Sequence, residues 1–433
     1  MINFLYNLVF VIPAKILLPF FFFFNEKIRK REKSWKAILN QTKIDYDRKR
    51  IWFHSASMGE FEQAKSIIES IKQTNPEIFI IVSFFSPSGY ENQKNYQFAD
   101  SIIYLPFDIK KNAKLLLDKL KPDCCVFIRY DVWLNILTEI KKRNIPALLI
   151  NATKPLKLNS NFILFRAYLK KVYSLFDEIT TVGEIHTDFF KKILPDKKIQ
   201  TLTDTRFDRI INQIETSRKN PIISRDIFQN NELILIAGSS WEPDEDIIFG
   251  AYQQLSDELQ KKLRLIFVPH EPTSEHIERL SNLCGKSILL SEIIEDSKII
   301  NNFPDETPVI VDSIGKLLKL YGIADLAYVG GGFGVGIHSV TEPAGYGIPI
   351  ATGPKINNSP DALNLKNLGA LKPVNNTEEF LDWLKAMITS NELREKTGKI
   401  SKEYVIKNSG STEIVKNIIL NSGIFKEHHI QTK

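Results

Sequence analysis

Residues 51–60 read Ile51-Trp-Phe-His-Ser-Ala-Ser-Met-Gly-Glu60, an apolar run that passes through small residues to a glycine. The run predicts a buried strand over 51–54, and the glycine predicts a helix that begins near Gly59. From this point on, short runs rich in Ile, Val and Phe alternate with amphipathic stretches of helical spacing. That alternation is typical of an α/β fold in which helices cover parallel strands.

The predicted strands fall into two sets, separated by a polar stretch. The alternation stops at about residue 210, passes through Ser217-Arg-Lys-Asn-Pro221 and restarts at Leu233. We therefore expect two Rossmann-like, doubly wound domains that face a central cleft, over residues 31–215 and 216–410, followed by a C-terminal helix or tail at 411–433. The predicted strands are 51–54, 78–83, 101–105, 124–128, 147–150 and 178–182 in the first domain, and 233–237, 263–268, 309–312, 326–329 and 348–352 in the second.

Length and composition bound the class of protein. The chain has 433 residues, of which 43% are hydrophobic and 25% are charged. At about 100 to 200 residues per domain this predicts two or three domains, and it excludes disordered, collagen-like and multi-span membrane proteins. The three cysteines have no CxxC spacing, which excludes a disulfide framework and a Cys-based zinc site and favours a reducing, cytosolic setting. We expect no bound metal and no cofactor.

Positive charge is concentrated at the N-terminus. The formal net charge is +6, but residues 1–50 hold eleven Lys and Arg against four Asp and Glu, so the other 383 residues sum to −1. This distribution argues against nucleic-acid binding, which needs basic surface spread over a folded domain. It indicates that one end of the chain meets an anionic surface, and a membrane is the expected partner.

Residues 4–24 form an almost wholly apolar segment, followed by six Lys and Arg between residues 27 and 36. A helix of this length reaches about 30 Å, enough to cross a bilayer, but Lys15 costs about 2.5–3.5 kcal/mol at the centre and two prolines weaken the helix. Spanning the membrane and lying in one leaflet both stay open, and so does a core helix of the first domain. The charges follow the apolar run and no cleavage site is seen, so residues 1–30 are interpreted as a retained anchor with a basic flank, at the cytoplasmic face of the inner membrane.

Glu60 is a candidate catalytic base. It falls in the first turn of the helix predicted to begin near Gly59, where free N–H groups and the helix dipole favour the ionised carboxylate. A general base must be deprotonated and aimed at the cleft, and this position meets that requirement. A glutamate in a first turn also occurs as a simple cap, and that interpretation stays open.

A glycine-rich stretch follows the strand predicted over 326–329. Residues 329–343 read Val-Gly-Gly-Gly-Phe-Gly-Val-Gly-Ile-His-Ser-Val-Thr-Glu-Pro. Glycines let backbone N–H groups approach a phosphate, and the helix that follows adds positive potential. The stretch is neither a dinucleotide fingerprint, since no acidic residue about 20 positions on completes it, nor a Walker loop. A flexible turn is the alternative.

Polar residues follow two further strands of the second domain. Gly238-Ser-Ser240 comes after the first strand and Pro269-His270 after the next. Each alone is more often a cap or a turn, but ligands bind outside the carboxyl ends of strands in such sheets, so together they predict one binding site. Arg206 and Arg209, just before the boundary, are candidates either for neutralising an anion or for structural ion pairs.

Taken in order, these segments resemble the bacterial 3-deoxy-D-manno-octulosonic acid (Kdo) transferases of lipopolysaccharide synthesis. The similarity begins with the apolar start and its basic flank and continues over nearly the whole chain. The motifs that carry it are His54-Ser-Ala-Ser-Met-Gly-Glu60, Asp131-Val-Trp-Leu-Asn135, Gly238-Ser-Ser with Glu245, Val268-Pro-His270, the stretch from Asp312 to Asp325, Tyr328-Val-Gly-Gly-Gly, and His338-Ser-Val-Thr-Glu342-Pro-Ala with Gly353-Pro354.

The resemblance implies an inverting glycosyltransferase of the GT-B type, with the acceptor on the N-terminal domain and the nucleotide sugar on the C-terminal domain. The donor would be CMP-Kdo and the acceptor a lipid A precursor, lipid IVA. Glu60 matches the family's general base. Arg206 matches a family lysine and Arg129 aligns where the family often has an acidic residue, both positions being associated with transition-state stabilisation. The implied substrate-binding residues are Gly238, Ser239, Ser240, Pro269, His270, Ile314, Gly315, Lys316, Gly331, Gly332, Ser339, Val340, Thr341 and Glu342.

Three other interpretations stay open. The nearest is a GT-B glycosyltransferase or a sugar-nucleotide epimerase that uses a UDP sugar, because this fold leaves donor choice to a few side chains. A nicotinamide-dependent oxidoreductase is disfavoured, because the strand at 51–54 leads into Ser-Ala-Ser-Met-Gly-Glu and not into a three-glycine turn. The third is a peripheral membrane scaffold without catalysis. No Asp-x-Asp for a metal-bridged diphosphate is evident in a strand-end loop, and one departing phosphate can be balanced by backbone N–H groups and one or two cations.

Overall fold

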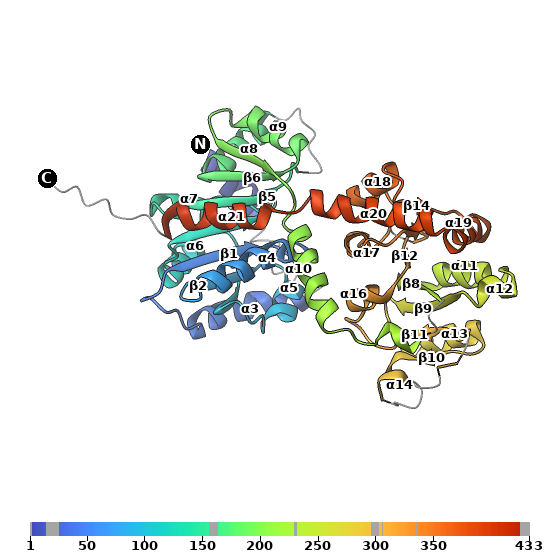
Figure 1. Cartoon of the computed structure of the whole chain (residues 1–433). Coiled ribbons are helices and arrows are strands. Elements are labelled where there is room, and N and C mark those ends of the chain that lie inside the picture. Colours follow the sequence, from blue (N-terminus) through green and yellow to red (C-terminus); the bar gives the residue numbers. More distant parts are fainter. Residues whose placement is uncertain are drawn as a thin grey trace. The chain divides into compact units, whose positions relative to one another are not determined.

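The computed structural model describes residues 2–13, 26–155, 163–228, 232–295, 303–304, 306–334 and 336–424 (Figure 1). These residues form two α/β units, one from Met1–Arg209 with Ser409–Lys433 and one from Ile210–Asn408. The boundary lies in helix α10 (Arg206–Lys219), a few residues before the predicted one. Helix α21 (Ser411–Ile419), expected to be part of a separate tail, packs on α4 (Met58–Thr74) and completes the N-terminal unit.

The N-terminal unit contains a seven-stranded parallel sheet in the order β3-β2-β1-β4-β5-β6-β7. All six predicted strands are present. The seventh, β7, was missed because its residues Lys198-Ile-Gln-Thr-Leu202 are mostly polar and lie on the exposed edge of the sheet. The strands are β1 (Arg50–Ser55), β2 (Phe79–Phe84), β3 (Ser101–Tyr104), β4 (Cys124–Ile128), β5 (Ala147–Ala152), β6 (Glu178–Val182) and β7 (Lys198–Leu202).

Both faces of this sheet are buried, which explains the apolar runs of the inner strands. Successive residues of a strand point to opposite faces, so Trp52 packs on one face while Ile51 and Phe53 pack on the other. Helices α3, α6, α7, α8 and α9 contribute to the first face, and α4 and α21 to the second. The helices are α3 (Glu26–Gln41), α5 (Pro87–Gln93), α6 (Lys110–Leu120), α7 (Leu134–Lys142), α8 (Ile163–Ser174) and α9 (Glu184–Ile193).

The C-terminal unit repeats this plan with a sheet in the order β10-β11-β9-β8-β12-β13-β14, whose paired strands are parallel. All five predicted strands are present, although β11 is shorter than expected. The edge strands β10 and β14 were missed because they are only two and three residues long. The strands are β8 (Leu233–Ser240), β9 (Leu263–Pro269), β10 (Ile288–Leu289), β11 (Val309–Ile310), β12 (Leu326–Val329), β13 (Ile350–Thr352) and β14 (Leu371–Pro373).

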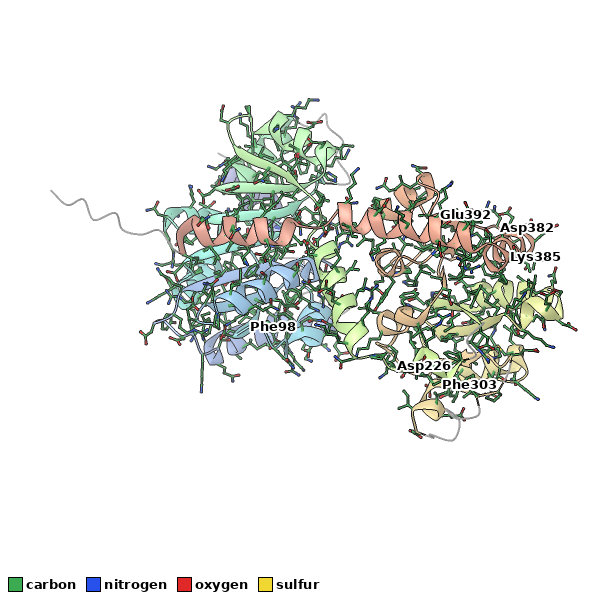
Figure 2. All side chains as sticks on the ribbon, in the orientation of Figure 1. Phe98, Asp226, Phe303, Asp382, Lys385 and Glu392 are labelled. Carbon is green, nitrogen blue, oxygen red and sulfur yellow. The ribbon has the colours of Figure 1, made fainter. Side chains whose placement is uncertain are left out.

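Amphipathic helices cover the second sheet as well. In α19 (Thr377–Thr389), Phe380, Trp383 and Leu384 are buried in the core, whereas Asp382 and Lys385 are exposed (Figure 2). The other helical segments of this unit are η2 (Arg225–Ile227), α11 (Glu242–Gln253), α12 (Asp257–Gln260), α13 (Ser274–Cys284), α14 (Leu290–Glu295), α16 (Leu317–Leu320), η3 (Tyr321–Ile323), α17 (Thr341–Tyr346), α18 (Pro360–Asn367) and α20 (Asn391–Lys407).

The first residues of the chain dock on the N-terminal unit through polar side chains. Helix α1 (Ile2–Tyr6) and the π-helical turn η1 (Asn7–Val11) place the Tyr6 hydroxyl 2.9 Å from Asp108 Oδ2, to which it donates, and the Asn7 amide 3.2 Å from Asn135 Oδ1. Phe4, Leu8 and Ile12 remain exposed. The amphipathic character of residues 2–12 therefore leaves an apolar face uncovered by the described part of the chain.

The predicted anchor is only partly described. Residues 14–25, which include Lys15, Pro19 and the Phe20–Phe24 run, lie outside the described residues. Among the residues that are described, no helix is long and apolar enough to cross a membrane. The basic flank is partly folded into the domain, because Arg31 is buried over the Phe85 ring and pairs with Glu32. That arginine therefore does not belong to an exposed basic surface.

Candidate active site

Each sheet reverses its strand order beside its first strand. The order runs outward from β1 to β2 and β3 on one side and to β4 on the other, and from β8 to β9 and to β12 in the same way. In doubly wound sheets, ligands bind outside the carboxyl ends of the strands at this reversal. Ligands are therefore expected at the loops after β1 and β4 in the N-terminal unit and at those after β8 and β12 in the C-terminal unit.

Glu60 lies in the first turn of α4, as predicted, but burial dominates its chemistry. It is 3% exposed, and its Oε2 accepts a hydrogen bond from the Ala56 N–H at 2.6 Å. Burial raises the pKa of Glu60, the Asp131 carboxylate raises it further, and the Ala56 N–H, His54 and Arg129 oppose the rise. The helix terminus was expected to favour the ionised form, but burial outweighs that effect. A base with a raised pKa is a stronger proton acceptor at neutral pH.

A chain of hydrogen bonds holds in place the Asp131 carboxylate, which raises the pKa of Glu60. The ring of His54, at the end of β1, places Nε2 2.6 Å from Asp131 Oδ2 and Nδ1 2.8 Å from Ser83 Oγ in the neighbouring strand β2. The Trp133 indole N–H donates to the same Asp131 oxygen at 3.1 Å. This pair was not predicted from the sequence, where His54 was only a motif residue. The signal that could have found it is that His54 lies near the end of β1 and Asp131 follows the adjacent strand β4.

Arg206 is held in place by a network that begins in the same helix as Glu60. Its Nε donates to Asp204 Oδ2 at 2.9 Å, and Gln63 Nε2 donates to that oxygen at 2.8 Å. Gln63 stands three residues after Glu60, which is nearly one turn of α4. Arg209, the other arginine predicted near the boundary, pairs with Glu62. The structure therefore links Arg206 to the helix that carries the candidate base and gives Arg209 a structural ion pair.

Arg129 follows β4 directly and has a left-handed backbone conformation, with φ of +69°. That conformation is uncommon outside glycine and marks strained positions that are often functional. The guanidinium group lies 5.5 Å from the centre of the Tyr130 ring. Its positive charge is one of the groups that lower the pKa of Glu60, so Arg129 stands near the candidate base.

In the C-terminal unit, the two serines at the end of β8 have different environments. Ser239 is half-buried, with φ of +52°, whereas Ser240 is fully buried and its hydroxyl donates to Glu245 Oε1 at 2.8 Å. Glu245 is also bound by His276 at 3.0 Å and by Arg279 at 3.0 Å. The Ser240 side chain was predicted to contact substrate, but this burial makes it a support for the loop.

The glycine loop after β12 is fixed by packing and by Asp244. Gly331 has φ of +93°, and its N–H donates to Asp244 Oδ2 at 2.9 Å. Asp244 also accepts from the Tyr328 hydroxyl at 2.9 Å and from the Trp241 N–H at 3.0 Å. A Cβ on Gly332 would come within 2.6 Å of Gly353 Cα. Gly331 and Gly332 are therefore held by Asp244 and by close packing, and the N–H of Gly331 is already engaged instead of being open to a phosphate.

Three planar side chains stack at the carboxyl edge of this sheet. The Trp241 and His270 ring centres lie 5.0 Å apart, and those of His270 and His338 lie 4.2 Å apart. The Trp241 indole N–H donates to His338 Nε2 at 3.3 Å. Burial and the neighbouring His270 lower the pKa of His338, which favours its neutral form. Trp241 is 37% exposed, so the stack presents an aromatic surface, which was not predicted from the sequence.

The remaining predicted binding residues lie on neighbouring loops at the same edge of the sheet. Ile314 is 79% exposed and Gly315 has φ of +77° in the loop that follows β11 and also holds Lys316. Ser339 is exposed, with its hydroxyl 3.1 Å from that of Thr341, and Glu342 lies in the first turn of α17. Other side chains are turned away from solvent, since Pro269, Val340 and Thr341 are buried. The structure thus gathers these loops at one edge of the sheet.

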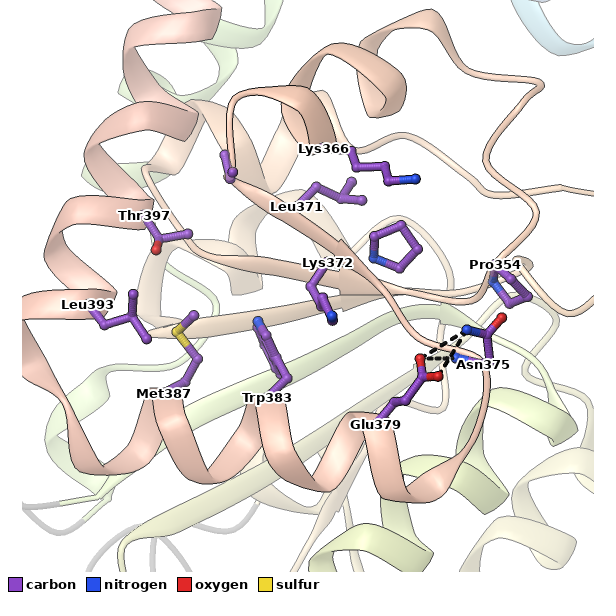
Figure 3. A pocket seen from close by; sticks show the side chains of 13 residues that line it. Pro354, Lys366, Leu371, Lys372, Asn375, Glu379, Trp383, Met387, Leu393 and Thr397 are labelled. Atoms are coloured by element: carbon purple, nitrogen blue, oxygen red, sulfur yellow. Dashed lines mark hydrogen bonds between the residues drawn. The ribbon is translucent and has the colours of Figure 1, made fainter.

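A pocket of about 850 Å³ lies elsewhere in the C-terminal unit, along the edge strand β14 (Figure 3). Trp383, Met387 and Leu393 line it, and Asn375 and Glu379 are hydrogen-bonded at its other end. It contains none of the predicted site residues. Within the described residues, no group of three or more His, Cys, Asp or Glu side chains is placed to hold a metal ion.

Comparisons with solved structures bear on the fold. Over 86% of this chain, the structure is similar to UDP-GlcNAc 2-epimerase from Neisseria meningitidis bound to UDP-GlcNAc, with a TM-score of 0.60, 15% identity and 100% of that chain covered. It is also similar to MurG from Acinetobacter baumannii, with a TM-score of 0.52 and 17% identity over 86% of this chain and 99% of that one. These likenesses confirm two parallel-sheet α/β domains that resemble GT-B glycosyltransferases.

Comparisons of sequence bear on the family. Residues 26–209 match the family model described as 3-deoxy-D-manno-octulosonic-acid transferase (kdotransferase). The chain is 27% identical over 371 residues to the 3-deoxy-D-manno-octulosonic acid transferase of Haemophilus influenzae, covering 84% of each chain. It is 29% identical over 333 residues to that of Chlamydophila psittaci, covering 74% of this chain and 73% of the relative. The match over residues 26–209 and the similarity to these relatives over most of the chain together support a Kdo transferase.

Proposed function

We propose that this protein transfers Kdo from CMP-Kdo to a lipid A precursor, with inversion at the anomeric carbon. The single observation that carries the proposal is Glu60, a buried carboxylate with a raised pKa at the carboxyl end of β1, in a chain of this family. In this reaction the acceptor hydroxyl attacks the anomeric carbon, Glu60 takes the hydroxyl proton, and the bond to the CMP phosphate breaks. The bonding electrons leave with CMP.

Cationic groups would balance the charge that develops on the departing phosphate. Arg206 is the first candidate, because Asp204 holds its guanidinium group and Gln63 supports Asp204 from α4. Lys316, in the loop after β11 of the C-terminal unit, is the second. Preorganised donors of this kind stabilise a developing negative charge more than mobile water does.

The C-terminal unit supplies features suited to a nucleotide. Trp241, stacked on His270, offers an aromatic face to a base, since aromatic stacking stabilises a bound base by about 1–3 kcal/mol. The exposed Ser339 hydroxyl and the first-turn Glu342 are suited to ribose hydroxyls. These features fit a nucleoside monophosphate sugar, but a uridine base would stack as well as a cytosine. Donor identity therefore rests on the family and not on the stack.

We also propose that the N-terminal segment holds the enzyme at the cytoplasmic face of the inner membrane, where a lipid acceptor is met. The exposed side chains of Phe4, Leu8 and Ile12 support this, because they form one apolar stripe at helical spacing while Asn3, Tyr6 and Asn7 bind the domain. The exposed lysines Lys33 and Lys36 of α3 add positive charge for anionic headgroups.

One experiment tests donor, acceptor and reaction together. The purified full-length protein is incubated with lipid IVA and CMP-Kdo, and the lipid is analysed by mass spectrometry. We expect lipid products heavier by one or more Kdo units and release of CMP. An unchanged lipid would contradict the proposal. Calorimetry with CMP and with UDP distinguishes this proposal from the nearest alternative, an enzyme that uses a UDP sugar. Binding of UDP without binding of CMP would favour that alternative.

A further inference from the structure

The guanidinium group of Arg129 is a half-buried charge that forms no ion pair with the residues that the structure describes. Its Nε is buried and lacks a hydrogen-bond partner within the described residues. Its backbone is held in the left-handed region with φ of +69°, and its N–H donates to the Ile150 carbonyl of β5 at 2.8 Å. A buried donor without an acceptor is costly, and a strained backbone that presents it is typical of a ligand site.

Two further donors stand at the ends of the next two strands. Strands β4, β5 and β6 are adjacent and parallel, so their carboxyl ends meet at one edge of the sheet. Arg129 follows β4, the exposed Lys154 follows β5, and His186 lies in the first turn of α9, which follows β6. The backbone N–H of Lys154 donates to His186 Nδ1 at 3.1 Å, which leaves His186 Nε2 as an N–H donor in the neutral ring.

The charges of this cluster act on one another. Burial lowers the pKa of His186, and the Lys154 and Arg129 cations lower it further, so both cations lie near the imidazole ring. The nearest acidic side chain of the same loop as Arg129 is Asp131, and His54 and Trp133 already bind its carboxylate. The cluster therefore gathers three basic side chains on the unit that carries Glu60.

We infer that Arg129, Lys154 and His186 form a binding site for a phosphate group of the acceptor. This inference rests on the proposed function, in which Glu60 must reach the acceptor hydroxyl and the N-terminal unit must therefore bind the acceptor. A lipid A precursor is a phosphorylated disaccharide, and a guanidinium fork with an ammonium group and a neutral N–H matches a phosphate. In this role Arg129 binds and orients the acceptor.

Kinetics with two acceptors tests the inference on the full-length protein. One acceptor is the lipid A precursor with both phosphates, and the other is the same lipid after a phosphatase has removed one or both. For Arg129→Gln we expect the KM for the phosphorylated lipid to rise about 10- to 100-fold while the KM for the dephosphorylated lipid changes little. Lys154→Gln should shift KM in the same direction by a smaller factor. The KM for CMP-Kdo should stay within about threefold.

Lys114→Gln is the matched control, because it removes one exposed positive charge from α6 of the same unit and should leave both KM values unchanged. Equal discrimination between the two lipids in wild type and Arg129→Gln would overturn the inference. So would a rise in the KM for CMP-Kdo alone, which would assign Arg129 to the donor, or an equal loss of kcat with both lipids. Circular dichroism and CMP binding verify that the variant is folded. If the wild type transfers Kdo to neither lipid, the proposed function itself fails.

Discussion

His54 Nε2 and Asp131 Oδ2 lie 2.6 Å apart at the ends of adjacent strands, and the Asp131 carboxylate raises the pKa of Glu60. The His54 ring is fully buried and is bound on its other side by Ser83. This pair therefore fixes a negative charge near the candidate base, on a carboxylate whose side chain is 18% exposed. A neighbouring negative charge of this kind makes a carboxylate a stronger proton acceptor.

Replacing Asp131 by Asn should lower the pKa of Glu60, because it removes a negative charge that opposes ionisation. The base would then stay ionised to lower pH, so the acidic limb of the pH profile of kcat/KM should move to lower pH. The turnover at neutral pH should fall, since a weaker base takes the proton less readily. Initial rates from about pH 4 to pH 9 measure both effects. An acidic limb that stays in place would separate Asp131 from Glu60.

Asp204 should act on turnover only through Arg206. Its Oδ2 accepts from Arg206 Nε at 2.9 Å and from Gln63 at 2.8 Å, so Asp204→Asn weakens the hold on the guanidinium group. We expect Arg206→Gln to lower kcat about 10- to 100-fold and Asp204→Asn to lower it less. The double variant should be no slower than Arg206→Gln alone. Additive losses in the double variant would mean that Asp204 has a separate role.

Trp241 should govern nucleotide affinity. Its ring stacks with His270 at 5.0 Å between centres, and 37% of the residue is exposed for contact. Trp241→Ala should weaken CMP binding about tenfold or more, because base stacking is worth about 1–3 kcal/mol. Trp241→Phe keeps an aromatic face and should bind CMP within about threefold of wild type. Calorimetry measures both variants, and equal CMP affinity in Trp241→Ala and wild type would remove the residue from the donor site.

Deleting residues 1–25 should release the protein from membranes and weaken its use of a lipid acceptor. The segment includes the exposed apolar side chains of Phe4, Leu8 and Ile12. The triple variant with serine at these three positions tests the stripe without removing the polar contacts of Tyr6 and Asn7. Sedimentation with vesicles that contain anionic lipid measures the effect. Unchanged sedimentation of the deletion variant would contradict the anchor.

Much of the architecture could be predicted from periodicity, because the inner strands are buried on both faces and read as apolar runs. The strands β7, β10 and β14 could not, because edge strands are short or half-polar and carry little apolar signal. The return of α21 to the N-terminal unit was also missed. Its buried residues Val415 and Ile419 pack against residues more than 300 positions earlier, and no local pattern specifies such a partner.

The sequence predicted which residues belong to the candidate site, but not the contacts that these residues make. Glu60 could be placed in a first turn from its glycine and strand, but its raised pKa depends on burial and on Asp131, which the sequence does not reveal. Ser240 was expected to contact substrate because it lies at the end of a strand. Its side chain is instead buried and donates a hydrogen bond to Glu245, five residues on. Asp244 was missed because its partners Gly331 and Tyr328 are distant in sequence.

The most direct test is the turnover of Glu60→Gln with CMP-Kdo and the lipid acceptor, beside calorimetry with CMP. Glutamine keeps the size of the side chain and an oxygen for the Ala56 N–H, so the fold and the donor site should be preserved. We predict a loss of turnover of about 10²- to 10⁴-fold with little change in CMP affinity. Turnover close to that of the wild type would contradict the assignment of Glu60 as the base.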